Sequence, residues 1–258
     1  MAFLDVEFYS RSLIRPVTFK MFLPNDPREG EAPENIRTLF LLHGYTGAAG
    51  LWGHEQLAEK YRVALVMPNG ENAFYLDGIS TGHKYASFLG QELVEYLRRT
   101  FGLARRREET GICGLSMGGF GALHTALAYP ETFGMAGAMS SALIVHEVAH
   151  LKPGESNGVA NYEYYRECFG DLGQVEESDA NPEMLVDRLK ASGRALPEIY
   201  MCCGTEDFLL EPNRSFHRFL TDREVPHIYK ESSGGHDGVF WGEYTPRIME
   251  WMFGSRQC

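Results

Sequence analysis

The stretch that decides the fold runs from Thr110 to Gly119 and reads TGICGLSMGG. Its first half is a short apolar run typical of a buried strand, and its second half holds Ser116 between glycines in a G-x-S-x-G pattern. Glycines suit this position because the sharp turn brings neighbouring backbone too close for a Cβ atom. The helix-period segment Met117 to Ala128 follows directly and is stopped by Pro130. The pattern predicts that Ser116 lies at the tip of a sheet and at the N-terminus of a helix, where negative charge is favoured.

On both sides of this motif, short apolar runs alternate with segments of helical periodicity. Five runs are apolar on both faces, as parallel strands need when helices cover both sides of a sheet: Thr38 to Leu42, Val63 to Met67, Gly111 to Leu115, Met135 to Met139 and Ile199 to Cys203. The segment Lys84 to Phe101 carries the apolar stripe of an amphipathic helix. Ala2 to Leu23 alternates apolar with polar residues and predicts two antiparallel strands. We therefore expect an α/β fold with a mostly parallel sheet, antiparallel N-terminal strands and helices on both faces.

The chain is predicted to form a single domain over residues 1–258. We find no internal repeat, and the most linker-like piece, Asn25 to Asn35, is only as long as a loop. Residues 141–181 break the alternation and are rich in Gly, Glu and Tyr. We expect them to form a small lid insertion above the carboxyl ends of the strands. A partly ordered surface insertion is the alternative.

Composition and charge exclude several classes of protein. The 258 residues are 44% apolar and 12% aromatic, which is enough for one large core. With 35 acidic and 24 basic residues the net charge is −11, so there is no basic surface for nucleic acid or for an anionic membrane. No segment reaches the length of a membrane span, and the first thirteen residues lack the pattern of a secretory signal. Five cysteines without C-x-x-C spacing are typical of reduced thiols, and we expect a cytoplasmic protein.

A serine hydroxyl becomes a nucleophile only beside a base that an anion orients. After a G-x-S-x-G turn of this kind, the expected chain order is serine, then a carboxylate, then histidine. Asp207 lies in a polar loop after a predicted strand, and Glu206 is the fallback. His236 lies in a glycine-rich loop after the next predicted strand and is the histidine with the right order and context. We predict a catalytic triad of Ser116, Asp207 and His236.

Two backbone amides are predicted to bind an oxyanion formed at Ser116. The N–H of Met117 directly follows the serine, which is the usual place for one donor. The second donor should come from the loop after the first long parallel strand, where Gly44 lets the backbone turn inward, and we predict the N–H of Tyr45. His43, in the same loop, is predicted to be a buried hydrogen-bonding residue that holds the loop.

Several aromatic residues are candidates to contact a substrate, because aromatic walls suit a mostly apolar pocket. Each could equally be part of the core or of the surface. The candidates are Trp52, Tyr75 and the tyrosines of the lid, Tyr162, Tyr164 and Tyr165.

The segment His146 to His150 matches H-E-x-x-H, a zinc-binding pattern when it lies on a helix. Glu163 or Glu167 could then supply a third ligand. However, the sequence Lys152 to Gly154 cuts any helix short, and the segment belongs to the predicted lid. We therefore predict a partly exposed lid helix without a metal, with a structural zinc site or a metalloprotease as the alternative.

Taken together, these motifs resemble the esterase D and S-formylglutathione hydrolase group of α/β-hydrolases, and within it the compact bacterial tributyrin, acetyl and feruloyl esterases. The matching segments are LLHGYTGAAGLW (41–52), MPNGENAFYLD (67–77), GLSMGGFGALHTALAYPETF (114–133), CGTEDFL (203–209) and GHDGVFW (235–241). The resemblance implies an α/β-hydrolase fold and a serine hydrolase without a cofactor that cleaves short acyl or aromatic acyl esters through an acyl-enzyme. It also implies that Ser116, Asp207 and His236 match the triad of the family and that the lid lines the acyl pocket.

One departure from the family pattern separates two kinds of substrate. Thioester-cleaving relatives usually carry a longer, cysteine-containing loop near the oxyanion position, whereas this chain has the short HGYTG at 43–47. Oxygen esters are therefore favoured over S-formylglutathione. A non-catalytic ligand-binding protein on the same scaffold is a further alternative, although all three triad positions are filled. We predict a carboxylesterase acting on a small-molecule ester. The oligomeric state stays open between a monomer, a homodimer and a higher homo-oligomer, and the aromatic lid is a plausible surface for a dimer.

Overall fold

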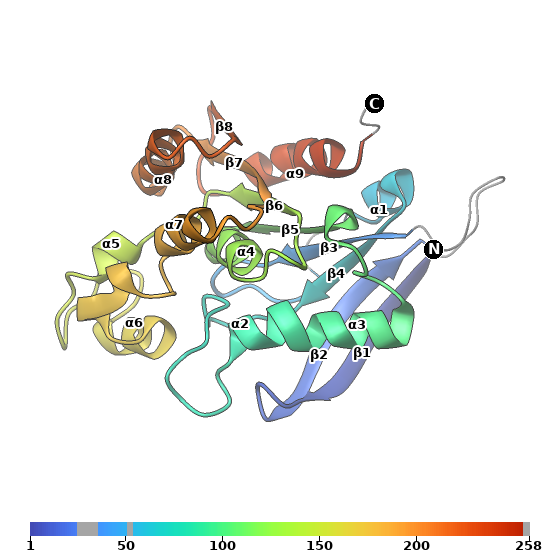
Figure 1. Cartoon of the computed structure of the whole chain (residues 1–258), viewed down its shortest axis with the longest axis horizontal. Helices are drawn as coiled ribbons and strands as arrows, with labels where there is room; N and C mark the ends of the chain where they lie inside the picture. Colours follow the sequence, from blue (N-terminus) through green and yellow to red (C-terminus); the bar gives the residue numbers. More distant parts are fainter. Residues whose placement is uncertain (25–35, 51–53, 255–258) are drawn as a thin grey trace.

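The structure is a computed structural model that describes residues 1–24, 36–50 and 54–254. Within these ranges, eight strands form one sheet in the order β1-β2-β4-β3-β5-β6-β7-β8 (Figure 1). The strands are β1 (Ala2–Ser10), β2 (Arg15–Leu23), β3 (Arg37–Leu42), β4 (Val63–Pro68), β5 (Thr110–Leu115), β6 (Met135–Met139), β7 (Glu198–Gly204) and β8 (His227–Ser232). Strand β2 pairs antiparallel with β1 and β4, and all pairs from β4 to β8 are parallel. The predicted mostly parallel sheet with two antiparallel N-terminal strands is confirmed.

Burial along the strands follows the two hydrophobic patterns of the sequence. In β1 every second residue is exposed, because one face of this edge strand meets solvent. Every residue of β4 and β6 is buried, as expected for parallel strands between two layers of helices.

Helices cover both faces of the sheet. They are α1 (Glu55–Tyr61), α2 (Tyr85–Ser87), the π-helical η1 (Phe88–Glu92), α3 (Leu93–Phe101), the 3₁₀ turn η2 (Arg107–Glu109), α4 (Met117–Ala128), α5 (Val145–Val148), α6 (Tyr162–Phe169), the 3₁₀ segment η3 (Leu172–Glu177), α7 (Pro182–Ser192), α8 (Leu210–Asp222) and α9 (Gly238–Phe253). Helices α1 and α9 share one core cluster with the sheet, whereas α3, α4, α7 and α8 contribute to the cluster on its other face (Figure 1). Among the described residues, no helix is long and apolar enough to span a membrane.

The segment Lys84 to Phe101, predicted as one amphipathic helix, contains a π-helical turn at its centre. Helix α2, η1 and α3 follow one another without a break. Gly90 lies in the π-helical turn, and a Cβ atom there would come within 2.2 Å of the Tyr129 ring. The Glu92 carboxylate at the end of the turn accepts hydrogen bonds from Ser10 and from the backbone between β1 and β2. The π-helical turn therefore lies between the close packing of Gly90 on Tyr129 and the hydrogen bonds of the half-buried Glu92 carboxylate.

Residues 141–181, the predicted lid, contain α5, α6 and η3. Figure 1 shows α5 and α6 together at one end of the molecule. Side chains from this segment line a cavity that reaches Ser116. The segment therefore lies beside the end of β5, where a lid over the sheet is expected.

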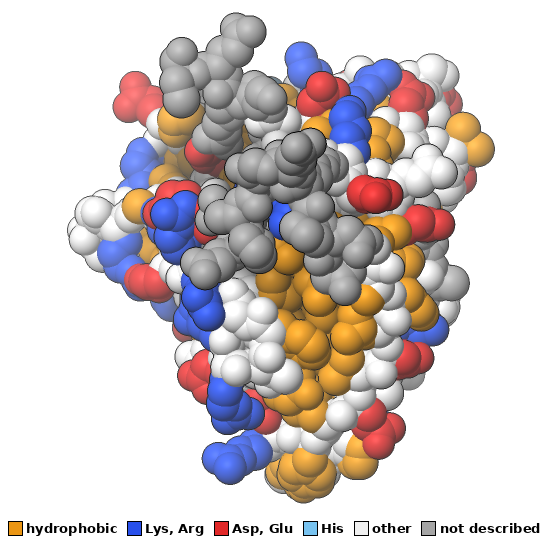
Figure 2. All heavy atoms as spheres, turned by 90° about the vertical axis from the view of Figure 1, so that its right-hand side faces the viewer, with side chains coloured by type: hydrophobic (Ala, Val, Ile, Leu, Met, Phe, Trp, Pro, Cys, Tyr) orange, Lys and Arg blue, Asp and Glu red, His pale blue; other side chains and the backbone are white. Residues whose placement is uncertain are grey.

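The side of the molecule where the chain begins carries an exposed apolar area bordered by charged residues (Figure 2). Strand β1 presents Phe3 and Tyr9 to solvent, with 56% and 61% of their surface exposed. Asp5 and Glu7 lie between them on the same face of the strand. Charged side chains on an edge strand oppose pairing with the strand of another molecule.

Candidate active site

Ser116 lies in a sharp turn between the end of β5 and the start of α4. Its backbone angles, φ +55° and ψ −121°, belong to a region that residues with a side chain rarely adopt. The turn is held by hydrogen bonds from the Ser116 N–H to the Met139 carbonyl (2.9 Å) and from the Phe120 and Ala142 N–H groups to the Ser116 carbonyl (3.1 and 3.0 Å). These bonds fix the strained backbone that presents the hydroxyl.

The glycines beside Ser116 are required by close backbone contacts. A Cβ atom on Gly114 would lie 2.1 Å from the carbonyl oxygen of Gly118, and one on Gly118 would lie 2.2 Å from the carbonyl oxygen of Leu42. Both distances are shorter than the non-bonded contacts that Cβ atoms make in proteins. The first turn of α4 therefore packs directly on the ends of β3 and β5, which is the reason predicted for the flanking glycines.

The three residues predicted as a triad lie within hydrogen-bonding distance of one another. The Ser116 Oγ is 3.0 Å from His236 Nε2, and His236 Nδ1 is 2.9 Å and 3.0 Å from the two Asp207 oxygens. Because a carboxylate only accepts hydrogen bonds, Nδ1 carries the imidazole proton and Nε2 is the acceptor that faces the serine hydroxyl. Residues from the ends of β5, β7 and β8 thus meet at one edge of the sheet.

Asp207 is a buried carboxylate with several donors. Its side chain accepts hydrogen bonds from His236, from the Leu209 N–H (2.8 Å) and from the Ser140 hydroxyl. Burial by itself raises the pKa of this carboxyl, but the hydrogen bonds from His236, Ser140 and Leu209 outweigh burial and hold the pKa below its ordinary value. Asp207 is therefore ionised at neutral pH and able to orient the imidazole.

Glu206, the fallback for the anion, binds the histidine loop instead. Its carboxylate accepts hydrogen bonds from the Gly234 N–H (2.5 Å) and the Ser233 hydroxyl (3.3 Å). Its other oxygen accepts from the Thr205 hydroxyl (2.7 Å). Glu206 thus anchors the loop that carries His236, two residues beyond Gly234.

Two aromatic residues that sequence reasoning did not select lie against His236. The ring of Phe208, which is 68% exposed, lies 4.6 Å from the imidazole centroid. The ring of Trp241 lies 5.0 Å away and nearly perpendicular, and its indole N–H donates to the buried Ser140 hydroxyl (3.1 Å). Phe208 directly follows Asp207, and Trp241 ends the segment quoted for the family resemblance. Both residues could have been selected from the sequence because they lie within a few positions of a predicted triad residue.

The predicted oxyanion donors, the amides of Tyr45 and Met117, both belong to residues that line a cavity at Ser116. Met117 is the first residue of α4, so its N–H has no acceptor within the helix. Across the described parts of the chain, neither amide donates a hydrogen bond to another protein group. Both are available to a ligand oxygen.

His43 holds the oxyanion loop, as predicted. Its Nε2 accepts from the Gly70 N–H (2.9 Å), which leaves Nδ1 to donate to the Gly44 carbonyl (2.8 Å). Burial lowers the pKa of His43, so the ring stays neutral. The Tyr75 hydroxyl donates to the His43 carbonyl from behind the loop (3.0 Å).

The two aromatic substrate-contact candidates from the sequence have different outcomes. Tyr75 is only 1% exposed and supports the His43 loop, and it lines neither of the cavities that reach Ser116. The structure therefore gives Tyr75 a position in the core instead of a contact with a substrate. Trp52 lies outside the described residues.

Two cavities meet at Ser116. The larger, of about 590 Å³, will be called the catalytic cleft, and its lining includes His236, Trp241 and the loop 43–47. The smaller, of about 150 Å³, will be called the inner cavity, and its lining includes Met117 and Phe74. Seven residues of segment 141–181 line the inner cavity: Ala142, Ile144, Glu147, Asn157, Val159, Tyr164 and Tyr165. Two of the three lid tyrosines proposed as contacts, Tyr164 and Tyr165, are thus at this cavity.

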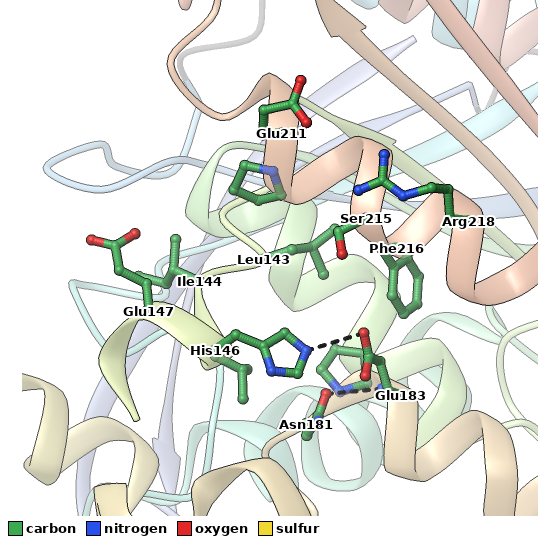
Figure 3. A pocket seen from close by; sticks show the side chains of 13 residues that line it. Leu143, Ile144, His146, Glu147, Asn181, Glu183, Glu211, Ser215, Phe216 and Arg218 are labelled. Atoms are coloured by element: carbon green, nitrogen blue, oxygen red, sulfur yellow. Dashed lines mark hydrogen bonds and ion pairs between the residues drawn. The ribbon is translucent and has the colours of Figure 1, made fainter. Parts of the chain in front are cut away.

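The H-E-x-x-H segment is not arranged as a metal site. Helix α5 is only four residues long, and His146 forms a hydrogen bond with Glu176 (2.5 Å). A second hydrogen bond joins His146 to Glu183 (3.3 Å) (Figure 3). Burial alone would lower the pKa of His146, but the hydrogen bonds with these glutamates raise the pKa above its ordinary value. The residues that the structure describes contain no group of three His, Cys, Asp or Glu side chains able to hold a metal ion.

The chain is similar to known esterases and hydrolases in sequence and in fold. Residues 10–251 match the family model described as putative esterase. An acetyl esterase from Caldicellulosiruptor saccharolyticus is 40% identical, with 98% of each chain covered. Among solved structures, fluorophosphonate-binding serine hydrolase F of Staphylococcus aureus superposes with a TM-score of 0.87 at 24% identity, covering 98% of this chain and 99% of that one. An S-formylglutathione hydrolase of the same organism has a TM-score of 0.84 at 25% identity, covering 98% of both chains.

The similarity in sequence and in fold extends over almost the whole chain. The α/β-hydrolase architecture expected from the motifs is confirmed. The chain belongs to the esterase D and S-formylglutathione hydrolase family and is a serine esterase.

Proposed function

We propose that this esterase hydrolyses carboxylic esters of short acyl groups through an acyl-enzyme on Ser116. The observation that carries the proposal is the hydrogen-bonded series Ser116, His236 and Asp207 at the point where two cavities meet. A nucleophile, a base and an orienting anion are the groups that acyl transfer requires.

In the first half of the reaction, the Ser116 oxygen attacks the ester carbonyl carbon while His236 Nε2 takes the hydroxyl proton. The carbonyl oxygen becomes an oxyanion, which the amides of Tyr45 and Met117 stabilise. Asp207 stabilises the imidazolium cation that forms. The tetrahedral intermediate then collapses, and the leaving alcohol oxygen takes the proton from His236.

In the second half, a water molecule attacks the acyl-enzyme and His236 takes one of its protons. The same two amides stabilise the second oxyanion. Collapse of this intermediate breaks the bond to the Ser116 oxygen, which recovers its proton from His236 as the carboxylic acid leaves. Besides the ester and one water molecule, every group used in these proposed steps belongs to the chain.

The two cavities suggest where each part of the ester binds. His236 must reach the leaving alcohol oxygen, and it lines the catalytic cleft but not the inner cavity. We therefore assign the alcohol to the cleft and the acyl group to the inner cavity.

The size of the inner cavity favours a short acyl group. Its volume of about 150 Å³ is well below the roughly 300–1,000 Å³ of pockets that enclose drug-sized ligands. A feruloyl group would fill such a cavity only with rearrangement, whereas an acetyl or butyryl group fits. The 40% identical relative named acetyl esterase supports the same choice.

The proposal is tested with the Ser116→Ala variant and p-nitrophenyl acetate. We expect turnover to fall by about 10⁴-fold or more, because the variant lacks the nucleophile, while the melting temperature changes little. Ser192→Ala, a serine at the far end of α7, is the matched control and should retain full activity. Wild-type turnover in Ser116→Ala would overturn the assignment.

Two further measurements separate the alternatives. A burst of p-nitrophenol stoichiometric with the enzyme indicates an acyl-enzyme, whereas the absence of both a burst and steady turnover would favour a ligand-binding protein. A higher kcat/KM for S-formylglutathione than for p-nitrophenyl acetate would favour the thioesterase.

We further propose that the protein is cytoplasmic. The support is that the four cysteines in the described ranges, Cys113, Cys168, Cys202 and Cys203, are buried and free. Fractionation of the source cells tests the location. Sedimentation velocity distinguishes a monomer from a homodimer or a higher homo-oligomer.

A further inference from the structure

A second cavity lies next to the inner cavity, and the two share lining residues. This second cavity, of about 350 Å³, will be called the side cavity, and it lies between α5, α7 and α8 (Figure 3). Ser116 lines the inner cavity but not the side cavity. Three residues line both cavities and therefore form the wall: Ile144, Glu147 and Pro212.

Of these three, Ile144 is the buried apolar side chain of the wall. It is 6% exposed and directly precedes α5, where its carbonyl accepts the Val148 N–H (2.9 Å). Pro212 is half-buried in the first turn of α8, where a missing N–H does least harm.

Glu147 forms the polar part of the wall. Its carboxylate accepts a hydrogen bond from Asn157 (2.8 Å), whose own oxygen accepts from the buried Tyr165 hydroxyl (3.1 Å). The position of Glu147 is therefore set by the lid. Figure 3 shows Ile144 and Glu147 together on one side of the side cavity, opposite Phe216 and Arg218.

The side cavity can accept apolar groups next to this wall. Leu143, Pro182 and Phe216 contribute apolar surface, and the His146 ring is held at one side by Glu183. A chain that passed the position of Ile144 would enter a space more than twice the volume of the inner cavity.

We propose that Ile144 is the residue that limits acyl-chain length, by closing the inner cavity against the side cavity. This inference rests on the proposed ester hydrolysis at Ser116 and adds to it the substrate class, straight acyl chains short enough to end at Ile144. Replacement by a smaller residue joins the two cavities and admits longer straight chains.

The expected effect follows from the transfer of methylene groups out of water. Each methylene group of the substrate that moves from water into an apolar cavity raises kcat/KM by about fourfold. If the side cavity accommodates two or more additional methylene groups, kcat/KM for the longer ester rises by about tenfold or more relative to kcat/KM for the acetate.

The test measures kcat/KM for p-nitrophenyl acetate, butyrate, hexanoate and octanoate. We expect the ratio of octanoate to acetate to rise about tenfold or more in Ile144→Ala and by a smaller factor in Ile144→Val. Leu143→Ala is the matched control, because Leu143 lines the side cavity and not the inner cavity. A series of alkyl acetates, which lengthens only the alcohol, should show the same ratios in wild type and Ile144→Ala.

Each outcome decides one question. Unchanged acyl ratios in both Ile144→Ala and Ile144→Val, with acetate hydrolysis retained, would overturn the inference, as would an equal rise in Leu143→Ala. If Ile144→Ala does not fold, Ile144→Val and Ile144→Phe decide, and Ile144→Phe should lose butyrate hydrolysis more than acetate hydrolysis. A wild-type protein that hydrolyses no ester would instead contradict the proposed function itself.

Discussion

Ser140 connects Trp241 to the Asp207 carboxylate beneath the imidazole. It is fully buried at a backbone φ of +46°, a left-handed conformation that a residue with a side chain adopts only when its surroundings hold it there. Its hydroxyl accepts from the indole N–H and hydrogen-bonds to Asp207. Ser140 therefore acts through Asp207 as a positioning residue, without touching the proposed reacting atoms.

Removal of this hydroxyl should slow catalysis without weakening substrate binding. A hydrogen bond to a charged group contributes about 1.5–3 kcal/mol, so we expect Ser140→Ala to lower kcat by roughly tenfold or more while KM changes little. Ser140→Gly, which suits the positive φ but also lacks the hydroxyl, separates the hydrogen bond from backbone strain. Wild-type kcat in both variants would contradict a positioning role.

At the scale of secondary-structure elements, His146 ties the lid to the body of the protein. It belongs to α5, and its two carboxylate partners belong to η3 and α7. Because the hydrogen bonds with these carboxylates raise the pKa of His146 in the folded state, the protonated ring stabilises this junction. The contribution is complete below the unfolded pKa of about 6.5 and is lost as the pH rises through the higher folded value.

The stability of a His146→Gln variant should therefore depend on pH in a specific direction. We expect its melting temperature to fall furthest below that of the wild type near pH 5.5, and the difference to be smaller at pH 9, because the wild-type ring loses its proton as the pH rises. Thermal unfolding at both pH values measures this difference. A difference in melting temperature that stays constant or grows with pH would contradict a stabilising role for the ion pairs of His146.

Periodicity predicted most elements because burial on one or two faces leaves a direct mark on the sequence. The five apolar runs are β3 to β7, since a strand between two helical layers has no polar face. The π-helical turn at Phe88–Glu92 left no such mark, because its causes are a close approach of Gly90 to Tyr129 and the contacts of Glu92 with the turn after β1.

In the candidate active site, too, some features could be predicted from the sequence and others could not. The order of serine, carboxylate and histidine along the chain was enough to bring Ser116, Asp207 and His236 together as candidates. The hydrogen bond between Ser140 and Trp241 joins residues 101 positions apart, and nothing in either local sequence indicates it. Tyr75 was selected as an aromatic residue near the site, but aromatic character does not reveal which side of a loop a ring packs on.

For the whole molecule, the net charge of −11 should influence the choice of substrate. A negative potential repels anionic esters and leaves neutral ones unaffected, and salt screens it over a Debye length of about 10 Å at 0.1 M. We expect kcat/KM for an anionic ester, such as mono-p-nitrophenyl succinate, to rise when salt increases from about 20 mM to about 200 mM, with no such rise for p-nitrophenyl acetate. An equal salt response of both esters would contradict this expectation.

The central claim of this account is that a covalent bond forms between the acyl group and Ser116. Mass spectrometry of the protein after reaction with a fluorophosphonate tests it most directly, because the adduct is stable and its position can be sequenced. We predict a single adduct per chain, located on the peptide that contains Ser116, with much slower labelling in His236→Ala. An adduct on another residue, or equal labelling of Ser116→Ala, would contradict the claim.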